Sequence, residues 1–148
     1  YPSSQLRTSD TAILDPTIIM NAVSSEKQDG SEVASAALSA IASIRSRVAE
    51  LCDLPAGHIE PLQLVRYLPG QFYKAHVDWS GPDDASLWIA GQRVATVLAY
   101  ITETPPSCSG GRTHFTQLGQ KGSRGMDSGG LYITPVKGAA VAWLNVDM

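Results

Sequence analysis

The chain has 148 residues, of which 43% are hydrophobic and 17% charged, and these shares are typical of a globular protein with a core. Its formal net charge is -3 and it contains no basic run, which argues against a nucleic-acid backbone as the partner. No apolar run reaches the length of a membrane span.

The clearest predicted element is a long helix in the first third of the chain. Apolar residues recur at positions 33, 37, 41, 44, 48 and 51, in steps of three and four, which is the spacing of one helical face. The sequence DLPAG at 53–57 ends this pattern. Residues 1–28 give no comparable signal and contain only a short apolar stretch that Pro16 interrupts.

After Pro61 the helical period gives way to alternation, which predicts strands. The expected strands cover 61–68, 71–79, 93–101, 113–118, 131–136 and 139–146, and residues 119–130 read as a surface loop. One long helix followed by many strands, without alternating helices, predicts an α+β protein that is mainly β, with an antiparallel sheet or barrel.

His76 and Asp78 lie two positions apart in one of these predicted strands, so their side chains point to the same face. An imidazole nitrogen together with a carboxylate oxygen suits Fe(II), Mn(II) or Zn(II). Taken alone, however, a His-x-Asp triplet favours an ordinary hydrogen-bonded pair near a strand end.

The surrounding sequence favours a metal site. The blocks LVRYLPGQFYKAHVDW, GQRVATVLAYI, GGRTHF and ITPVKGAAVAWLN resemble, in order and spacing, the catalytic domain of the prolyl 4-hydroxylases, which are Fe(II)- and 2-oxoglutarate-dependent dioxygenases. The resemblance implies a double-stranded β-helix, or jelly roll, with the long N-terminal helix as a support. It also implies that residues 1–148 form a single oxygenase domain that is incomplete at both ends.

The resemblance implies site roles residue by residue. His76 and Asp78 match the first two iron ligands, and Tyr67 and Thr113 match residues that bind 2-oxoglutarate. Without the resemblance, Tyr67 would be a core tyrosine with its hydroxyl at the surface, and Thr113 would be an ordinary strand residue.

The resemblance also implies a role in the substrate groove for three further residues. Arg93 matches an arginine near the peptide groove, and Tyr73 and Trp79 flank the ligands where they could shape it. Arg93 could equally be a solvated charge at a sheet edge.

Other candidate ligands are less suited to the metal. His114 neighbours Thr113 and therefore points to the opposite face of its strand, and His58 is expected to be solvated in a loop. In the family, a second histidine and a lysine or arginine that binds 2-oxoglutarate follow the strand at 139–146, and neither is present in this chain. Lys137 is no substitute, because it matches the lysine of a turn between strands.

The implied activity is hydroxylation of peptidyl proline, coupled to oxidative decarboxylation of 2-oxoglutarate to succinate and carbon dioxide. The implied cofactors are Fe(II), 2-oxoglutarate and ascorbate, and the implied partner is a proline-containing polypeptide. The family often works in the endoplasmic reticulum and secretory pathway, although the sequence leaves the compartment, the oligomeric state and the pairing of Cys52 with Cys108 open.

Three alternatives remain at this point. The chain could belong to another oxygenase branch, such as a lysyl hydroxylase or a nucleic-acid demethylase, of which the acidic balance disfavours the second. It could be a non-catalytic binding or structural subunit that keeps the fold without a complete iron site. A cupin-like zinc or manganese protein usually has more histidines than the three found here.

Overall fold

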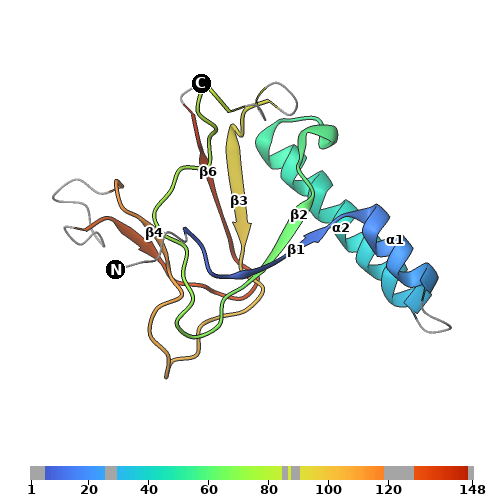
Figure 1. Ribbon diagram of the computed structural model, residues 1–148, viewed down its shortest axis with the longest axis horizontal. Coiled ribbons are helices and arrows are strands. Elements are labelled where there is room, and N and C mark those ends of the chain that lie inside the picture. The colour runs from blue at the N-terminus through green and yellow to red at the C-terminus, as the bar shows by residue number, and fades with distance from the viewer. Residues whose placement is uncertain (1–5, 26–29, 85–86, 88–90, 119–128, 147–148) are drawn as a thin grey trace. The chain divides into compact units, whose positions relative to one another are not determined.

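The computed structural model describes residues 6–25, 30–84, 87, 91–118 and 129–146 (Figure 1). The chain divides into two compact units, Tyr1–Tyr73 and Lys74–Met148. The first unit contains two helices and a pair of strands, and the second contains two pairs of strands. The fold is therefore mixed, with a helical first unit and a β second unit, which agrees with the predicted α+β class.

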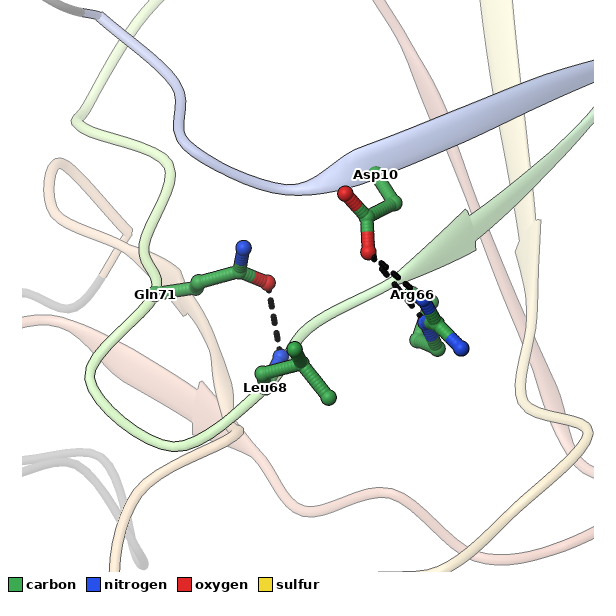
Figure 2. Close-up of polar contacts among 4 residues, drawn as sticks. All are labelled: Asp10, Arg66, Leu68 and Gln71. Carbon is green, nitrogen blue, oxygen red and sulfur yellow. Dashed lines mark hydrogen bonds and ion pairs between the residues drawn. The ribbon is translucent and has the colours of Figure 1, made fainter.

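The strands of the first unit are β1 (Asp10–Leu14) and β2 (Leu62–Arg66), which pair antiparallel from Asp10↔Arg66 to Leu14↔Leu62. The guanidinium of Arg66 donates to one carboxylate oxygen of Asp10, at 3.2 Å from Nε and 2.9 Å from Nη2 (Figure 2). The backbone N–H of Leu68 then donates to Oε1 of Gln71 at 2.7 Å, which holds the turn that follows β2. The strand predicted at 61–68 is confirmed, whereas its partner β1 lies where no strand was expected.

Helix α1 (Pro16–Ser25) also lies in the stretch that gave no clear sequence pattern. Asp15 precedes it and accepts from the backbone N–H groups of Thr17 at 2.7 Å and Ile18 at 3.4 Å. Proline tolerates the first position of a helix, where its missing N–H costs nothing. The hydrogen bond from the Thr17 amide is the main reason that the pKa of the Asp15 carboxyl lies below its usual value of 3.8.

Helix α2 (Gly30–Cys52) lies beside α1 (Figure 1) and leads into a 3-10 turn, η1 (Ala56–His58). Its buried side chains are Ala34, Ile41 and Ala49. The expected apolar face is therefore only partly correct, because Val33 is 71% exposed and Leu51 66% exposed. The buried stripe contains mostly small residues, which allow a neighbouring element to approach the helix closely.

In the second unit, β3 (Ala95–Ala99) pairs antiparallel with β6 (Ala140–Leu144), from Ala95↔Leu144 to Ala99↔Ala140. Backbone hydrogen bonds extend this ladder at both ends, from Tyr100 N–H to the Ala139 carbonyl and from Asn145 N–H to the Val94 carbonyl, each at 2.9 Å. The strands predicted at 93–101 and 139–146 are confirmed.

The other pair of the second unit consists of β4 (Thr113–Phe115) and β5 (Leu131–Ile133), with Thr113 opposite Ile133. The ring of Phe115 meets that of Trp143 on β6 edge to face, with 5.0 Å between their centroids. The hydroxyls of Tyr100 and Thr113 lie 2.7 Å apart. Side chains of β4 thus contact Trp143 on β6 and Tyr100, the residue that directly follows β3.

The prediction of a strand over 71–79 is wrong. These residues form no strand, and only Tyr73 makes an isolated bridge, with Arg7. Val77 and Trp79 would share one face of a strand and are exposed, and Phe72 and His76 on the other face are exposed too, so neither face is buried as a strand of a core sheet would require. Side chains instead bond to backbone groups here, namely the carbonyl of Lys74 and, directly after the segment, the backbone N–H and carbonyl of Ser80.

Two further expectations concern the cysteines and the loops. Both Cys52 and Cys108 are free thiols. Most of the loop predicted at 119–130 lies outside the described residues. Of the helices that the structure describes, neither is both long enough and apolar enough to cross a membrane.

Candidate metal and cosubstrate site

His76 and Asp78 come together although the segment that carries them is not a strand. Nε2 of His76 lies 3.2 Å from Oδ1 of Asp78, and the two side chains are 29% and 22% exposed. Nδ1 of His76 lies 2.8 Å from the carbonyl oxygen of Lys74. A carbonyl can only accept, so Nδ1 carries the hydrogen, and in a neutral ring Nε2 then presents its lone pair.

With a neutral His76, this arrangement would place a nitrogen lone pair against a carboxylate oxygen. Two acceptors at such a distance repel one another unless a positive charge, either a proton or a metal ion, lies against both. Neighbouring ligands of a first-row metal stand roughly 3 Å apart when each bond measures about 2.0–2.2 Å. The pair therefore fits two adjacent positions of such a metal in both chemistry and spacing.

The second oxygen of Asp78 is held by a chain of hydrogen bonds. Oγ1 of Thr96, on β3, donates to Oδ2 of Asp78 at 2.7 Å, and Nδ2 of Asn145 donates to the same Thr96 hydroxyl at 2.9 Å. Asn145 stands beside Thr96 because the β3–β6 ladder continues through the bond between Asn145 N–H and the Val94 carbonyl. The sheet thus fixes the carboxylate through two polar side chains.

A side-chain clamp holds the residues that follow Asp78. The amide of Gln92 accepts from the backbone N–H of Ser80 and donates to its carbonyl, both at 2.8 Å. These two bonds reproduce what a neighbouring strand would offer to one residue. They position the segment beside the start of β3 without a β-ladder.

A second polar pair lies further along β3. Thr96, Leu98 and Tyr100 alternate onto one face of the strand, and the Tyr100 hydroxyl contacts that of Thr113 on β4. The face therefore has polar groups at both ends and an apolar leucine between them. Thr113 was a predicted cosubstrate residue, and its partner here is Tyr100 rather than either predicted metal ligand.

The remaining predicted site residues are exposed. Trp79 is exposed next to Asp78, and Arg93 is exposed just before β3. Tyr67 and Tyr73 belong to the first unit, where both are exposed, and the guanidinium carbon of Arg7 lies 4.9 Å from the centre of the Tyr73 ring. Their roles in binding cosubstrate or substrate stay predictions.

The expectations for the other two histidines are confirmed. The ring of His114 stacks on Tyr132 with 3.9 Å between centroids, on the side of β4 opposite to Thr113. His58 is exposed in η1. Among the described residues, no group of three or more His, Cys, Asp or Glu side chains is placed to hold a metal.

Sequence reasoning missed Thr96, Tyr100, Asn145 and Gln92. The signal was present in part, since Thr96 and Tyr100 are polar residues on one face of an otherwise apolar strand. Alternation alone did not show which side chains would face them. Asn145 and Gln92 gave no local signal, because each acts through a contact made by the folded chain.

Comparison with known proteins identifies the family. The sequence profile described as the 2OG-Fe(II) oxygenase superfamily matches residues 62–148, more than half of the chain. The chain belongs to this superfamily. The resemblance to prolyl 4-hydroxylases is confirmed as well, because the chain is 36% identical over 110 residues to prolyl 4-hydroxylase 1 of Arabidopsis thaliana. It is 29% identical over 113 residues to probable prolyl 4-hydroxylase 7 of the same plant.

The matched part of this oxygenase chain is large, whereas the matched part of its relatives is small. The two alignments cover 73% and 72% of the chain, but 38% and 34% of the relatives. The chain thus spans well under half the length of these curated relatives. The profile begins at the first residue of β2 and includes both His76 and Asp78.

Proposed function

We propose that this chain is part of an Fe(II)- and 2-oxoglutarate-dependent dioxygenase that hydroxylates proline residues in a polypeptide. The observation that carries the proposal is the His76–Asp78 pair, in which His76 Nε2 lies 3.2 Å from Asp78 Oδ1, so that with a neutral ring the two acceptor atoms would repel one another. A bound divalent iron would remove this repulsion. It would supply the activation of oxygen that is coupled to decarboxylation of 2-oxoglutarate to succinate and carbon dioxide.

The protein's own contribution to this chemistry is to hold and orient the reactants. His76 and Asp78 would hold the iron on one side and leave its other positions accessible. No general acid or base is needed for hydrogen abstraction from an aliphatic carbon, so the fold contributes geometry and exclusion of water. Ascorbate would act as a reductant that keeps the iron divalent.

The cosubstrate would lie along the face of β3 that carries Thr96, Leu98 and Tyr100. 2-Oxoglutarate has a charged group at each end and two methylene carbons between them. The polar Tyr100–Thr113 pair suits its distal carboxylate and Leu98 suits its methylene groups. Tyr67 is assigned to the same cosubstrate by its sequence match to the family.

The polypeptide substrate would bind to exposed residues near His76 and Asp78. Trp79 offers an aromatic surface, and Arg93 offers a donor for backbone carbonyls. Tyr73 would contribute a second aromatic ring. A proline-rich chain is already extended and has little conformational entropy to lose on such a surface.

The complete fold would be a jelly roll in which both units are parts of one domain and α2 supports the sheets. Within the second unit, the contact of Phe115 on β4 with Trp143 on β6 supports the packing of the pairs β3–β6 and β4–β5 that a jelly roll requires. A three-ligand iron site also needs a donor from outside the described residues, because none of these adds a third His, Cys, Asp or Glu to the pair.

The proposal is tested with the full-length protein. Titration with Mn(II), followed by electron paramagnetic resonance, should show one bound ion per chain, and H76A should abolish this binding. H114A is the matched control, because His114 stacks on Tyr132 and should not be a ligand. Succinate should then form from 2-oxoglutarate only when Fe(II) and a proline-containing peptide are present.

Two results would contradict the proposal in different ways. Failure of the wild-type protein to bind Mn(II) would favour a non-catalytic binding subunit that keeps the fold. Metal binding with succinate formation on lysine-containing but not proline-containing peptides would instead favour a lysyl hydroxylase.

A further inference from the structure

The hydrogen-bond chain from Asn145 through Thr96 to Asp78 has a defined direction. The Asn145 amide nitrogen can only donate, so the Thr96 oxygen must accept from it at 2.9 Å. The single hydroxyl hydrogen of Thr96 is then available for Oδ2 of Asp78, a carboxylate oxygen that can only accept, at 2.7 Å. The hydrogen bonds therefore run in one direction, from the Asn145 amide to the Thr96 hydroxyl and from that hydroxyl to the Asp78 carboxylate.

This direction leaves the two oxygens of Asp78 with different tasks. Oδ2 is occupied by Thr96, whereas Oδ1 faces Nε2 of His76 at 3.2 Å. A carboxylate that is free to rotate can bind a metal with one oxygen or with both. A hydrogen bond from a strand residue to the second oxygen competes with the metal for that oxygen and fixes the plane of the carboxylate, which favours the first mode.

We propose that Thr96 and Asn145 are positioning residues that make Asp78 a one-oxygen ligand. The inference rests on the proposed metal site and adds to it a reason for the orientation of this ligand. One-oxygen binding keeps a coordination position open, which the reaction needs because cosubstrate and oxygen must both reach the metal. Asn145 acts through Thr96, since its amide orients the hydroxyl rather than the carboxylate itself.

The sheet register explains how two distant residues form this device. Thr96 is the second residue of β3, and its cross-strand neighbour is Trp143 on β6. Asn145 lies two positions beyond Trp143 and therefore on the same face, and its backbone N–H is bonded to the Val94 carbonyl. A strand pair thus supplies a rigid support for a ligand that lies on an irregular segment.

The first test measures Mn(II) affinity in the full-length protein. T96V keeps the size of the side chain but removes its hydroxyl, and the affinity should fall about 10- to 100-fold, as for other groups that orient a metal ligand. T96S restores the hydroxyl and should bind Mn(II) nearly as well as the wild type. T134V is the control, because Thr134 is an exposed threonine after β5.

A double-mutant cycle tests whether Asn145 acts through Thr96. N145A should weaken Mn(II) binding less than T96V does, because the Thr96 hydroxyl can still donate to Asp78. The double variant T96V/N145A should bind no more weakly than T96V alone. Additive losses would show that Asn145 acts on the site by another route and would overturn that part of the proposal.

A spectroscopic readout separates positioning from a merely structural role. Carboxylate stretching bands of isotope-labelled aspartate differ between one-oxygen and two-oxygen metal binding. The wild type should show the one-oxygen pattern, and T96V should shift toward the two-oxygen pattern. N145A should shift the bands less than T96V, because the Thr96 hydroxyl can still donate to Asp78, and it is the variant to measure if T96V does not fold.

The outcomes distinguish this proposal from the one on which it rests. If T96V binds Mn(II) as the wild type does while H76A has lost binding, the metal site stands and the positioning role is wrong. If the wild type binds no Mn(II), the proposed function fails and the positioning role fails with it.

Discussion

Asp10 in the first unit and Asp78 in the second each present a carboxylate to the nitrogen of a basic side chain, yet their surroundings differ. Arg66 and Asp10 are 71% and 54% exposed, and two guanidinium nitrogens share one oxygen. His76 and Asp78 are 29% and 22% exposed, and the second carboxylate oxygen is engaged by Thr96.

The difference separates a contact that only joins two strands from one that is suited to a ligand. Asp10 and Arg66 face each other in the register of β1 and β2, and both charges remain largely hydrated. The Asp78 carboxylate is oriented by Thr96 of the sheet and directed at Nε2 of His76. Orientation of both oxygens, rather than the presence of a charged partner, marks the candidate site.

The largest expected difference between Asp10 and Asp78 is in metal binding. Replacing Asp78 by alanine removes one of two donors and should reduce Mn(II) affinity by at least about 100-fold. D10A removes the same group from the exposed pair and should leave the affinity unchanged. Isothermal titration of both variants checks this, and equal affinities would show that Asp78 is not a ligand.

The next largest effect concerns Gly130 in the second unit, a position where any other residue would be strained. This residue has a φ of +106°, and an added Cβ would lie 2.4 Å from the Phe115 carbonyl oxygen and 2.9 Å from Nε2 of His114. Because backbone cannot easily give way, G130A should lower the free energy of unfolding by at least about 2 kcal/mol.

Gly57 in the first unit provides the control, since an added Cβ there would meet nothing within 4 Å. G57A should change the stability by no more than about 0.5 kcal/mol. Urea unfolding followed by tryptophan fluorescence measures both variants. A G130A protein as stable as G57A would show that the β4–β5 pair tolerates a side chain at this position.

A smaller effect is expected at the exposed ion pair. R66Q should lower the free energy of unfolding by at most about 1 kcal/mol, because the attraction is weakened by water. The loss should shrink further at high salt, where exposed charges are screened. Thermal unfolding at low and high ionic strength checks this, and a loss that did not depend on salt would mean that packing, not charge, was removed.

The smallest predicted effect depends on pH and concerns Asp15. The folded-state pKa of this carboxyl lies below the usual 3.8, because the Thr17 amide donates to it. Because the folded-state pKa is lowered, the ionised carboxyl stabilises the folded protein at pH values above the unfolded-state pKa. This stabilisation is lost as the pH falls through the folded-state pKa. D15A should therefore melt at a lower temperature than the wild type at neutral pH, with a gap that narrows below about pH 4.

Glu50, an exposed residue of α2, is the control for this measurement. E50A also removes a carboxylate from the first unit but no helix cap, so its effect should not follow the titration of Asp15. A gap between D15A and wild type that stayed constant from neutral to acid pH would contradict the cap.

The sequence predicted most strands of the second unit because alternation is a local property. Residues 95–99 and 140–144 contain their own signal, and so do 113–115 and 131–133. It missed β1 and α1, although Asp15 followed by Pro16 is a recognised helix start. The short apolar stretch around Pro16 was treated as interrupted, whereas the proline separates a strand from a helix.

Of the candidate site, only the His-x-Asp pair could be predicted from a local sequence motif. His76 and Asp78 lie close together as the motif predicted, but the local structure was predicted wrongly, because an alternating segment with few buried side chains was taken for a strand; their role as ligands stays a prediction. Thr96 and Asn145 could not be assigned from sequence, since these two residues lie 49 positions apart and their contact depends on the register between β3 and β6.

The bidentate contact between Gln92 and Ser80 closes the stretch between them into a loop with fixed ends. The length and composition of residues 81–91 can therefore change without moving Asp78, because loop-closure entropy grows only slowly with length. A substitution at Gln92 would instead release the backbone of Ser80, and with it the segment that carries Asp78, without changing His76 or Asp78 themselves.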